Sequence, residues 1–361
     1  MADLAQRGNT RTMQVIGSIV ILVALAAVFA VSFQFMRNPA APKFLVAVVA
    51  LIVGVGGVWA LYLTVNNLVD QFPIRIRDKL RPYVFIFPAL IVLGVYIIYP
   101  TIRTTYVSFF DYTRGSGAPA NFGLQNYVEI FRDGEIFVAF RNNLLWLVLV
   151  PAFSVSMGLV IAVLVDRIRW ERLAKSLIFL PMAISFVGAS VIWRFIYYRA
   201  SFGEQIGLFN AIVVSFGGDP VGWLRIEPWN NVFLIIIMIW LQTGFAMVIL
   251  SSAVKGVPQS LLEAARIDGA GEVRVFFQII IPYVASTILT VTTTIVILVL
   301  KVFDVVFVMT SGRFNTDVLA NLMYNQMFRA GQYGRGAALA VILFLAVIPV
   351  MIRNIRNLNT R

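Results

Sequence analysis

The stretch EAARIDG at residues 263–269, followed after nine residues by IIIP at residues 279–282, is the most informative part of this chain. It lies in a polar break between two long apolar segments. In a membrane protein, a break of this kind is a loop that reaches the water on one side of the bilayer. The composition of the rest of the chain decides whether this interpretation holds.

The bulk composition is that of a membrane protein. The chain has 361 residues, of which 60% are hydrophobic and only 13% are charged, and several runs are long enough to cross a bilayer. The net charge of +12 comes from basic residues in short connections beside apolar runs, which indicates membrane orientation and excludes nucleic-acid binding. Cysteine and histidine are absent from the sequence, which excludes disulfides, thiolate metal sites and histidine proton shuttles.

Apolar runs of about 17 to 25 residues predict eight transmembrane helices. They cover approximately residues 13–36, 44–65, 83–107, 144–165, 176–197, 232–253, 284–306 and 337–352. A lipid-facing backbone must satisfy its own hydrogen bonds, so an all-α membrane protein is expected. The first run follows Arg7 and Arg11 but is longer than the core of a secretion signal, so we interpret it as retained.

Basic residues predict the orientation of the spans. One set of alternate connections holds 16 Lys and Arg residues, the other holds 10 in a greater length, and three lie inside spans. The denser set comprises residues 1–12, 66–82, 166–175, 254–283 and 353–361. By the positive-inside rule this set is cytoplasmic, which places both termini and the loop at residues 263–269 inside the cell.

The loop itself predicts two short helices. Pro258 ends the preceding apolar run, and Ser260 with Glu263 forms a Ser-x-x-Glu capping box, so a helix should begin near Ser260. Gly269 permits the left-handed conformation that ends a helix, and a second helix should begin near Glu272. An alternative is that Glu263 only caps its helix, whose apolar face rests on lipid headgroups.

The spacing EAA-x3-G-x9-I-x-L-P resembles the "EAA" loop of permease subunits in ATP-driven (ABC) importers, with Ile281 in place of the Leu. The segment GLQNY at residues 123–127 and the run from Ser176 to Pro181 resemble further elements of maltose-transporter-type (carbohydrate uptake) permeases. The closest likeness is to the alpha-glucoside permeases, on residues 312–324 and onward.

This resemblance implies a domain organisation. A six-helix type I importer core with the coupling loop at residues 254–283 would cover residues 83–356. Residues 1–82 would form two additional N-terminal helices with a basic linker, and residues 357–361 a cytoplasmic tail. The chain would lie in a bacterial or archaeal cytoplasmic membrane.

The resemblance also implies partners and a coupling site. Such permeases pair with a second, related permease, contact two ATPase subunits and receive sugar from an external binding protein. The sequence has no G-x4-G-K-[ST] phosphate loop, so no cofactor is expected on this chain, and ATP and Mg would be used by the ATPase. The residues expected to contact the ATPase are Ser260, Glu263, Ala264, Ala265, Asp268, Gly269 and Pro282.

A sugar path needs hydroxyl-binding groups and flat apolar surfaces near mid-membrane. Trp240, Gln242, Thr243 and Phe245 lie at about this depth in the sixth span, and the Gln242 amide offers both donors and acceptors. The threonines at residues 292–294 are at similar depth, but a membrane Thr usually bonds its own helix backbone. Gln242 is therefore the principal candidate.

Lys301 and Asp304 are one helical turn apart near the outer end of the seventh predicted span. They could pair with each other and serve at the entrance or gate of the path. The alternative is that Lys301 extends to the membrane surface.

The function expected from the resemblance is that of a permease subunit, not an enzyme, which moves an oligosaccharide such as maltose or trehalose. Two alternatives stay open: an ABC permease for another cargo, such as glycerol phosphate or an amino acid, and an ion-coupled secondary transporter. Acidic residues within the spans are nearly missing, which disfavours the latter.

Overall fold

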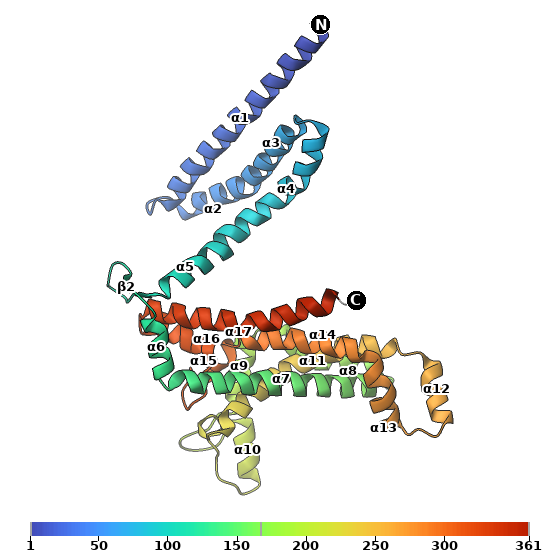
Figure 1. Cartoon of the computed structure of the whole chain (residues 1–361). Helices are drawn as coiled ribbons and strands as arrows, with labels where there is room; N and C mark the ends of the chain where they lie inside the picture. Colours follow the sequence, from blue (N-terminus) through green and yellow to red (C-terminus); the bar gives the residue numbers. More distant parts are fainter. Residues whose placement is uncertain (1, 167, 360–361) are drawn as a thin grey trace. The chain divides into compact units, whose positions relative to one another are not determined.

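The computed structural model describes residues 2–166 and 168–359, most of which are helical. The chain divides into two compact units, Met1–Arg103 and Thr104–Arg361. The helices of both are labelled in Figure 1. The sequence-based domain boundary, after residue 82, separates groups of predicted spans, whereas the two units are separated by their internal contacts. That boundary therefore stays a prediction.

The first unit consists of long apolar helices joined by short turns. They are α1 (Ala2–Arg37), α2 (Lys43–Leu51), α3 (Val58–Asp70) and α4 (Ile74–Leu93), and α5 (Tyr99–Val107) continues into the second unit. π-helical segments, Ile52–Gly57 and Gly94–Ile98, join α2 to α3 and α4 to α5. α3 packs between α1 and α4, so this unit has little interior and most of its apolar side chains are exposed.

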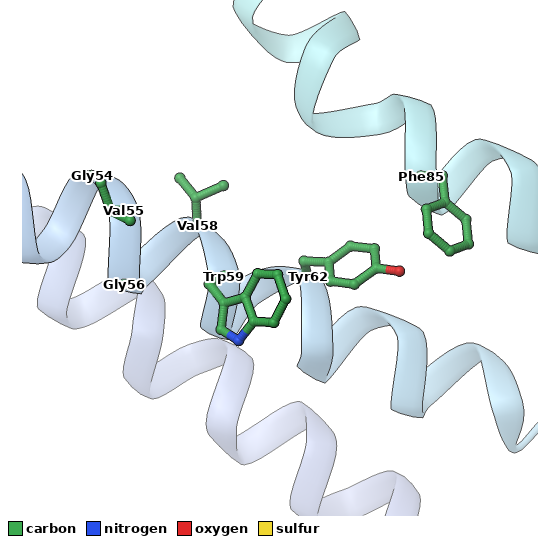
Figure 2. A pocket seen from close by; sticks show the side chains of 7 residues that line it. All are labelled: Gly54, Val55, Gly56, Val58, Trp59, Tyr62 and Phe85. Atoms are coloured by element: carbon green, nitrogen blue, oxygen red, sulfur yellow. The ribbon is translucent and has the colours of Figure 1, made fainter.

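Glycines beside α3 leave an apolar hollow on the first unit. Figure 2 shows Trp59 and Tyr62 of α3 and Phe85 of α4 next to the glycine-rich segment, and the ring centroids of Tyr62 and Phe85 are 5.3 Å apart. Apart from the tips of Trp59 and Tyr62, the side chains that line it offer a polar solute no hydrogen bond. We therefore assign this hollow no role in binding a polar substrate.

The second unit is a helical bundle with loops at both ends. It begins with a two-stranded antiparallel sheet, β1 (Phe110–Asp111) and β2 (Ala120–Phe122). Its helices are α6 (Gln125–Arg132), α7 (Glu135–Val165), α8 (Glu171–Phe179), α9 (Phe186–Ile196), α10 (Leu208–Ser215), α11 (Trp229–Lys255), α12 (Gln259–Ile267), α13 (Glu272–Val275), α14 (Ile281–Leu300), α15 (Asp304–Met309), α16 (Leu319–Tyr324) and α17 (Tyr333–Asn359). A π-helical segment, Phe276–Ile280, joins α13 to α14.

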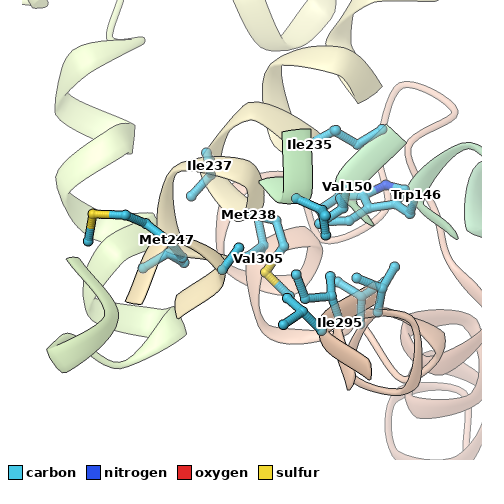
Figure 3. Packing of buried hydrophobic residues seen from close by; sticks show 14 of the residues in the cluster. Trp146, Val150, Ile235, Ile237, Met238, Met247, Ile295 and Val305 are labelled. Atoms are coloured by element: carbon cyan, nitrogen blue, oxygen red, sulfur yellow. The ribbon is translucent and has the colours of Figure 1, made fainter. Parts of the chain in front are cut away.

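Helix α11 is the centre of the bundle. It packs most extensively on α7 and also on α8 and α14. Figure 3 shows part of this core, in which Trp146 and Val150 of α7, Met238 of α11 and Ile295 of α14 are all less than 2% exposed. α11 is thus buried on several faces, which fits its nearly uniform apolar sequence.

Two glycines let the central helices approach closely. A Cβ added at Gly158 of α7 would lie 2.7 Å from the Cβ of Ala246 on α11. A Cβ added at Gly244 of α11 would lie 2.5 Å from the carbonyl oxygen of Ile178 on α8. Both distances are too short for any side chain, so glycine is required at these two crossings, as is common where membrane helices pack.

Within residues 2–166 and 168–359, six helices are long and apolar enough to cross a membrane. A seventh span results if the bent pair of α8 and α9 is counted as one. The last run predicted from the sequence lies in α17, whose apolar part, Tyr333–Pro349, is shorter than the others. The all-α membrane fold is confirmed, whereas the predicted count of eight spans is not.

The predicted span at residues 176–197 is not a straight helix. α8 continues into a 3-10 turn, Leu180–Ala183, and the chain bends by 101° before α9. Pro181 cannot donate a backbone hydrogen bond, and the Ser185 hydroxyl caps α9 by accepting from the Gly188 N–H at 3.0 Å. The local sequence therefore ends one helix and starts another at this place.

Candidate coupling loop and transport path

Helix α12 carries the EAA stretch and begins one residue earlier than predicted. Pro258 is at its N-cap, and no side chain caps the helix. Ser260 lies inside the first turn, where its hydroxyl is not placed to accept the first free N–H groups. The predicted capping box of Ser260 and Glu263 is therefore wrong, although a short helix is present as expected.

The turn after α12 is built as the sequence predicts. Gly269 has a φ of +81°, and the Ala270 N–H donates to the Ala265 carbonyl at 2.9 Å, which ends the helix. α13 begins at Glu272, whose Oε1 is 2.9 Å from Nε of Arg266. This ion pair and the glycine together fix the angle between α12 and α13.

The outer surface of the loop is exposed and partly apolar. Figure 1 shows α12 and α13 extending beyond one end of the helical bundle of the second unit. Glu263, Ala264 and Gly269 are exposed, and Ile267 has 86% of its surface accessible. Leu261 and Val273 of the same loop are exposed as well, and several exposed apolar side chains on one protruding loop are typical of a surface that another protein covers. Ser260, Asp268 and Pro282 are exposed as well, and Ala265 is half-buried.

An ionic cluster lies at the base of this loop, and sequence reasoning missed it. The Lys175 ammonium of α8 is 2.5 Å from Oδ1 of Asp166, which follows α7, and 2.7 Å from Oε1 of Glu171. Ser251 of α11 donates to Asp166 Oδ1 at 2.8 Å, and Lys255 pairs with Glu171. The cluster joins three helices next to the residue at which α11 leads into α12.

The bend between α8 and α9 borders a cavity of about 480 Å³ on one face of α11. Gln242 and Phe245 of α11 line it together with Thr294 of α14 and Asp304 of α15. The Gln242 side chain is 4% exposed, and it forms no hydrogen bond with any residue that the structure describes. A buried amide that borders a cavity without a protein partner is suited to bind a polar solute.

Trp240 and Thr243 lie on the opposite face of α11. They line a separate, strongly apolar cavity of about 760 Å³ between α7, α8 and α11. The Trp240 ring packs edge-on against Trp193 at 5.8 Å, and the Thr243 hydroxyl donates to the Ile239 carbonyl at 2.7 Å. The four path candidates of α11 therefore lie on two faces, and of these four Gln242 and Phe245 line the cavity at the α8–α9 bend.

Lys301 and Asp304 are not on one continuous helix. α14 ends at Leu300, and Asp304 begins α15, so the predicted one-turn spacing is wrong. Both residues line a small cavity of about 160 Å³, which shares Asp304 with the cavity at Gln242. They form no ion pair with each other or with any other described residue. Of the neighbouring threonines, Thr293 and Thr294 donate to their own helix backbone, as the alternative interpretation expects.

Buried asparagines hold the loop between α15 and α16. Asn142 of α7 donates to the carbonyls of Asn315 and Asp317 at 2.7 and 2.8 Å. Asn230 of α11 donates to the Phe314 carbonyl at 2.6 Å. Burial raises the pKa of Asp317 to about 6, although hydrogen bonds from Asn321 and the Val318 N–H lower it. The sequence signal for this cluster is a pair of asparagines directly before each of two apolar runs, those at residues 144–165 and 232–253.

The family profile described as "Binding-protein-dependent transport system inner membrane component" matches residues 147–358. The chain belongs to this family. The match covers α11, the EAA loop and the cavity at Gln242, so the resemblance found in the sequence is confirmed. The protein is a membrane-embedded permease subunit of an ABC importer, and members of the family are transport subunits rather than enzymes.

Two relatives are close. The chain is 60% identical over 279 residues to the osmoprotective compounds uptake permease protein GgtC of Synechocystis, covering 77% of this chain and 98% of the relative. It is 53% identical over 286 residues to the alpha-glucoside transport system permease protein AglF of Rhizobium meliloti, covering 79% and 84%. This chain aligns with each relative over most of that relative's length.

The fold is also that of solved importer permeases. A chain of a bacterial ABC transporter that imports the polysaccharide alginate superposes with a TM-score of 0.66 at 19% identity. The superposition covers 79% of this chain and 99% of that chain. No group of three or more Asp or Glu residues that could hold a metal ion occurs among the residues that the structure describes.

Proposed function

We propose that this permease moves a sugar, specifically an oligosaccharide of the α-glucoside type such as maltose or trehalose, into the cytoplasm. The cavity at the α8–α9 bend is the observation that carries the proposal. Gln242 offers a hydroxyl-binding amide there, and Phe245 offers a flat ring on which a sugar face can rest. The name of AglF supports α-glucosides as the cargo.

A second cargo follows from the higher identity to GgtC, whose name specifies osmoprotective compounds. Trehalose belongs to both classes, because it is an α-glucoside and also a compatible solute. A neutral, hydroxyl-rich cargo suits a cavity whose lining carries one carboxylate and no basic side chain. Glycerol phosphate, which is anionic, suits it poorly.

Transport requires an energy source, which we assign to partner subunits. In this proposal a second permease pairs with this chain, and two ATPase subunits hold ATP and Mg. α12 docks on an ATPase through Glu263, Ala264 and the exposed Ile267. Both termini lie in the cytoplasm. ATP-driven movement of the ATPases then switches the bundle between inward-open and outward-open states.

Uptake by the complete transporter in proteoliposomes tests the cargo. With ATP inside and binding protein outside, labelled trehalose and maltose should accumulate, whereas glycerol 3-phosphate and amino acids should not. Accumulation of only the latter would overturn the sugar assignment. Accumulation that follows an imposed ion gradient without ATP would overturn the ABC mechanism itself.

A further inference from the structure

The second unit has a cationic cavity that the transport path does not use. It has a volume of about 540 Å³ and lies between the end of α9, the segment before α11 and the loop after α15. Four arginines line it: Arg194, Arg199, Arg225 and Arg313. None of the residues that line it also lines the cavity at Gln242. The two cavities are thus separate sites.

The four arginines have no acidic partner in the chain. Their guanidinium groups form no ion pair or hydrogen bond with any described residue, and all four side chains are exposed. Their one recorded contact is that of Arg225, which lies 5.8 Å from the ring centroid of Phe314. By contrast, Arg335, predicted on the same side of the membrane, pairs with Asp133. The cavity therefore concentrates positive charge that the chain does not neutralise.

Aromatic packing and hydrogen bonds hold the walls of the cavity. Trp223 packs edge-on against Phe233 at 5.3 Å, and the Tyr197 hydroxyl donates to the Phe233 carbonyl at 2.9 Å. Asn210 donates to the carbonyls of Tyr198 and Val221, so it connects the segment after α9 to the segment before α11. These contacts fix the backbone from which Arg199 and Arg225 extend into the cavity.

The cavity is at the opposite end of α11 from the coupling loop. α11 begins at Trp229, four residues after Arg225, and ends at Lys255, four residues before α12. Its 27 residues span about 40 Å, which is the thickness of a bilayer. The arginines therefore face the outer side, where basic residues are disfavoured by the positive-inside rule. Membrane orientation therefore does not explain why four arginines gather at this place.

We propose that the cavity is a docking site for carboxylate side chains on the surface of the extracytoplasmic binding protein. Guanidinium groups pair with carboxylates in a bidentate geometry, and unpaired, solvated cations attract an acidic partner from a distance. A neutral sugar has no charge with which four arginines could pair. A water-soluble protein outside the cell can reach the outer face on which they lie. The inference rests on the proposed function, because it assumes a transporter that receives its sugar from such a protein.

Binding measurements on the assembled transporter test this site. The complete complex is placed in nanodiscs of zwitterionic lipid, and its affinity for its sugar-loaded binding protein is measured at low and high salt. The triple variant Arg199→Glu, Arg225→Glu and Arg313→Glu should weaken binding about tenfold or more and reduce its dependence on salt. Arg132→Glu, an exposed arginine at the end of α6, is the matched control and should change neither.

If the arginine cavity binds something other than the binding protein, the same variants give different results. Loss of the second permease from the purified triple variant would overturn the proposal in favour of a permease interface. A binding defect seen only in discs with phosphatidylglycerol would do so in favour of a lipid headgroup, and unchanged affinity and salt dependence would exclude the site. If instead the unmodified chain fails to co-purify with an ATPase, the proposed function itself has failed.

Discussion

The Lys175 ammonium and the Asp166 carboxylate lie 2.5 Å apart, with side chains only 19% and 14% exposed. Their helices, α8 and α7, are joined through this pair to Ser251 near the end of α11. The pair therefore ties α7 and α8 to the end of α11 that leads into α12.

Replacing Lys175 by Met should leave the Asp166 charge buried without its partner. We expect a loss of about 2 kcal/mol in the stability of the purified complex, since breaking a largely buried pair is costly. Thermal unfolding in detergent measures it. The double variant Lys175→Met with Asp166→Asn should recover part of the loss, and a double variant as unstable as the single one would contradict a pairing role.

Gly269→Val should disturb the coupling loop without disturbing the bundle. The position has a φ of +81° but open space around an added Cβ, so the penalty comes from the backbone, about 1–2 kcal/mol. We expect reduced co-purification of the ATPase and reduced uptake.

Glu263→Lys should also reduce co-purification and uptake, because it reverses an exposed charge. Gly271→Ala is the control, because its φ is ordinary and its surroundings are open. Full retention of partner and uptake in both variants would remove the loop from the coupling role.

Gln242→Ala should impair uptake while the complex still assembles. The loss of a hydroxyl-binding amide at the cavity should lower kcat/KM about tenfold, which corresponds to about 1.4 kcal/mol. Thr243→Val is the matched control, because that hydroxyl already donates to its own backbone and faces the other cavity. Equal effects of both substitutions would show that the cavity at Gln242 is not part of the transport path.

Asp317 should make stability depend on pH. Its pKa is raised from 3.8 to about 6 by burial, so the folded state holds the proton more tightly than the unfolded state. This contribution to stability is fully present below about pH 4, is lost as the pH rises from about 4 to 6, and amounts to about 3 kcal/mol in total. Asp317→Asn keeps Oδ1, which accepts from both Asn321 and the Val318 N–H, and should flatten this decline. Melting curves of the two proteins between pH 4.5 and 7.5 measure the difference, and parallel curves would exclude Asp317 as the cause.

Local sequence patterns predicted what depends on neighbouring residues. The apolar runs gave most spans, and Gly269 gave the turn with its positive φ. Patterns could not show that α14 ends before Lys301, because apolar residues dominate the sequence on both sides of the break and no proline or glycine marks it. They also could not show that Asn142 bonds a loop 173 residues away, or that Lys175 reaches Ser251. Such contacts depend on how helices cross, and periodicity within one helix carries no information about that.

The close contacts at Gly158 and Gly244 have a mechanical consequence. At these two crossings no side chain separates the helix backbones, so we expect α7, α8 and α11 to move together as one rigid body, which extends about 40 Å along α11. A tilt of about 5° at the EAA end would then displace the other end of α11 by about 3 Å. The bend before α9 and the break after α14 interrupt the helices beside this body, and both border the cavity that holds Gln242, so we expect movement of the body to reshape that cavity.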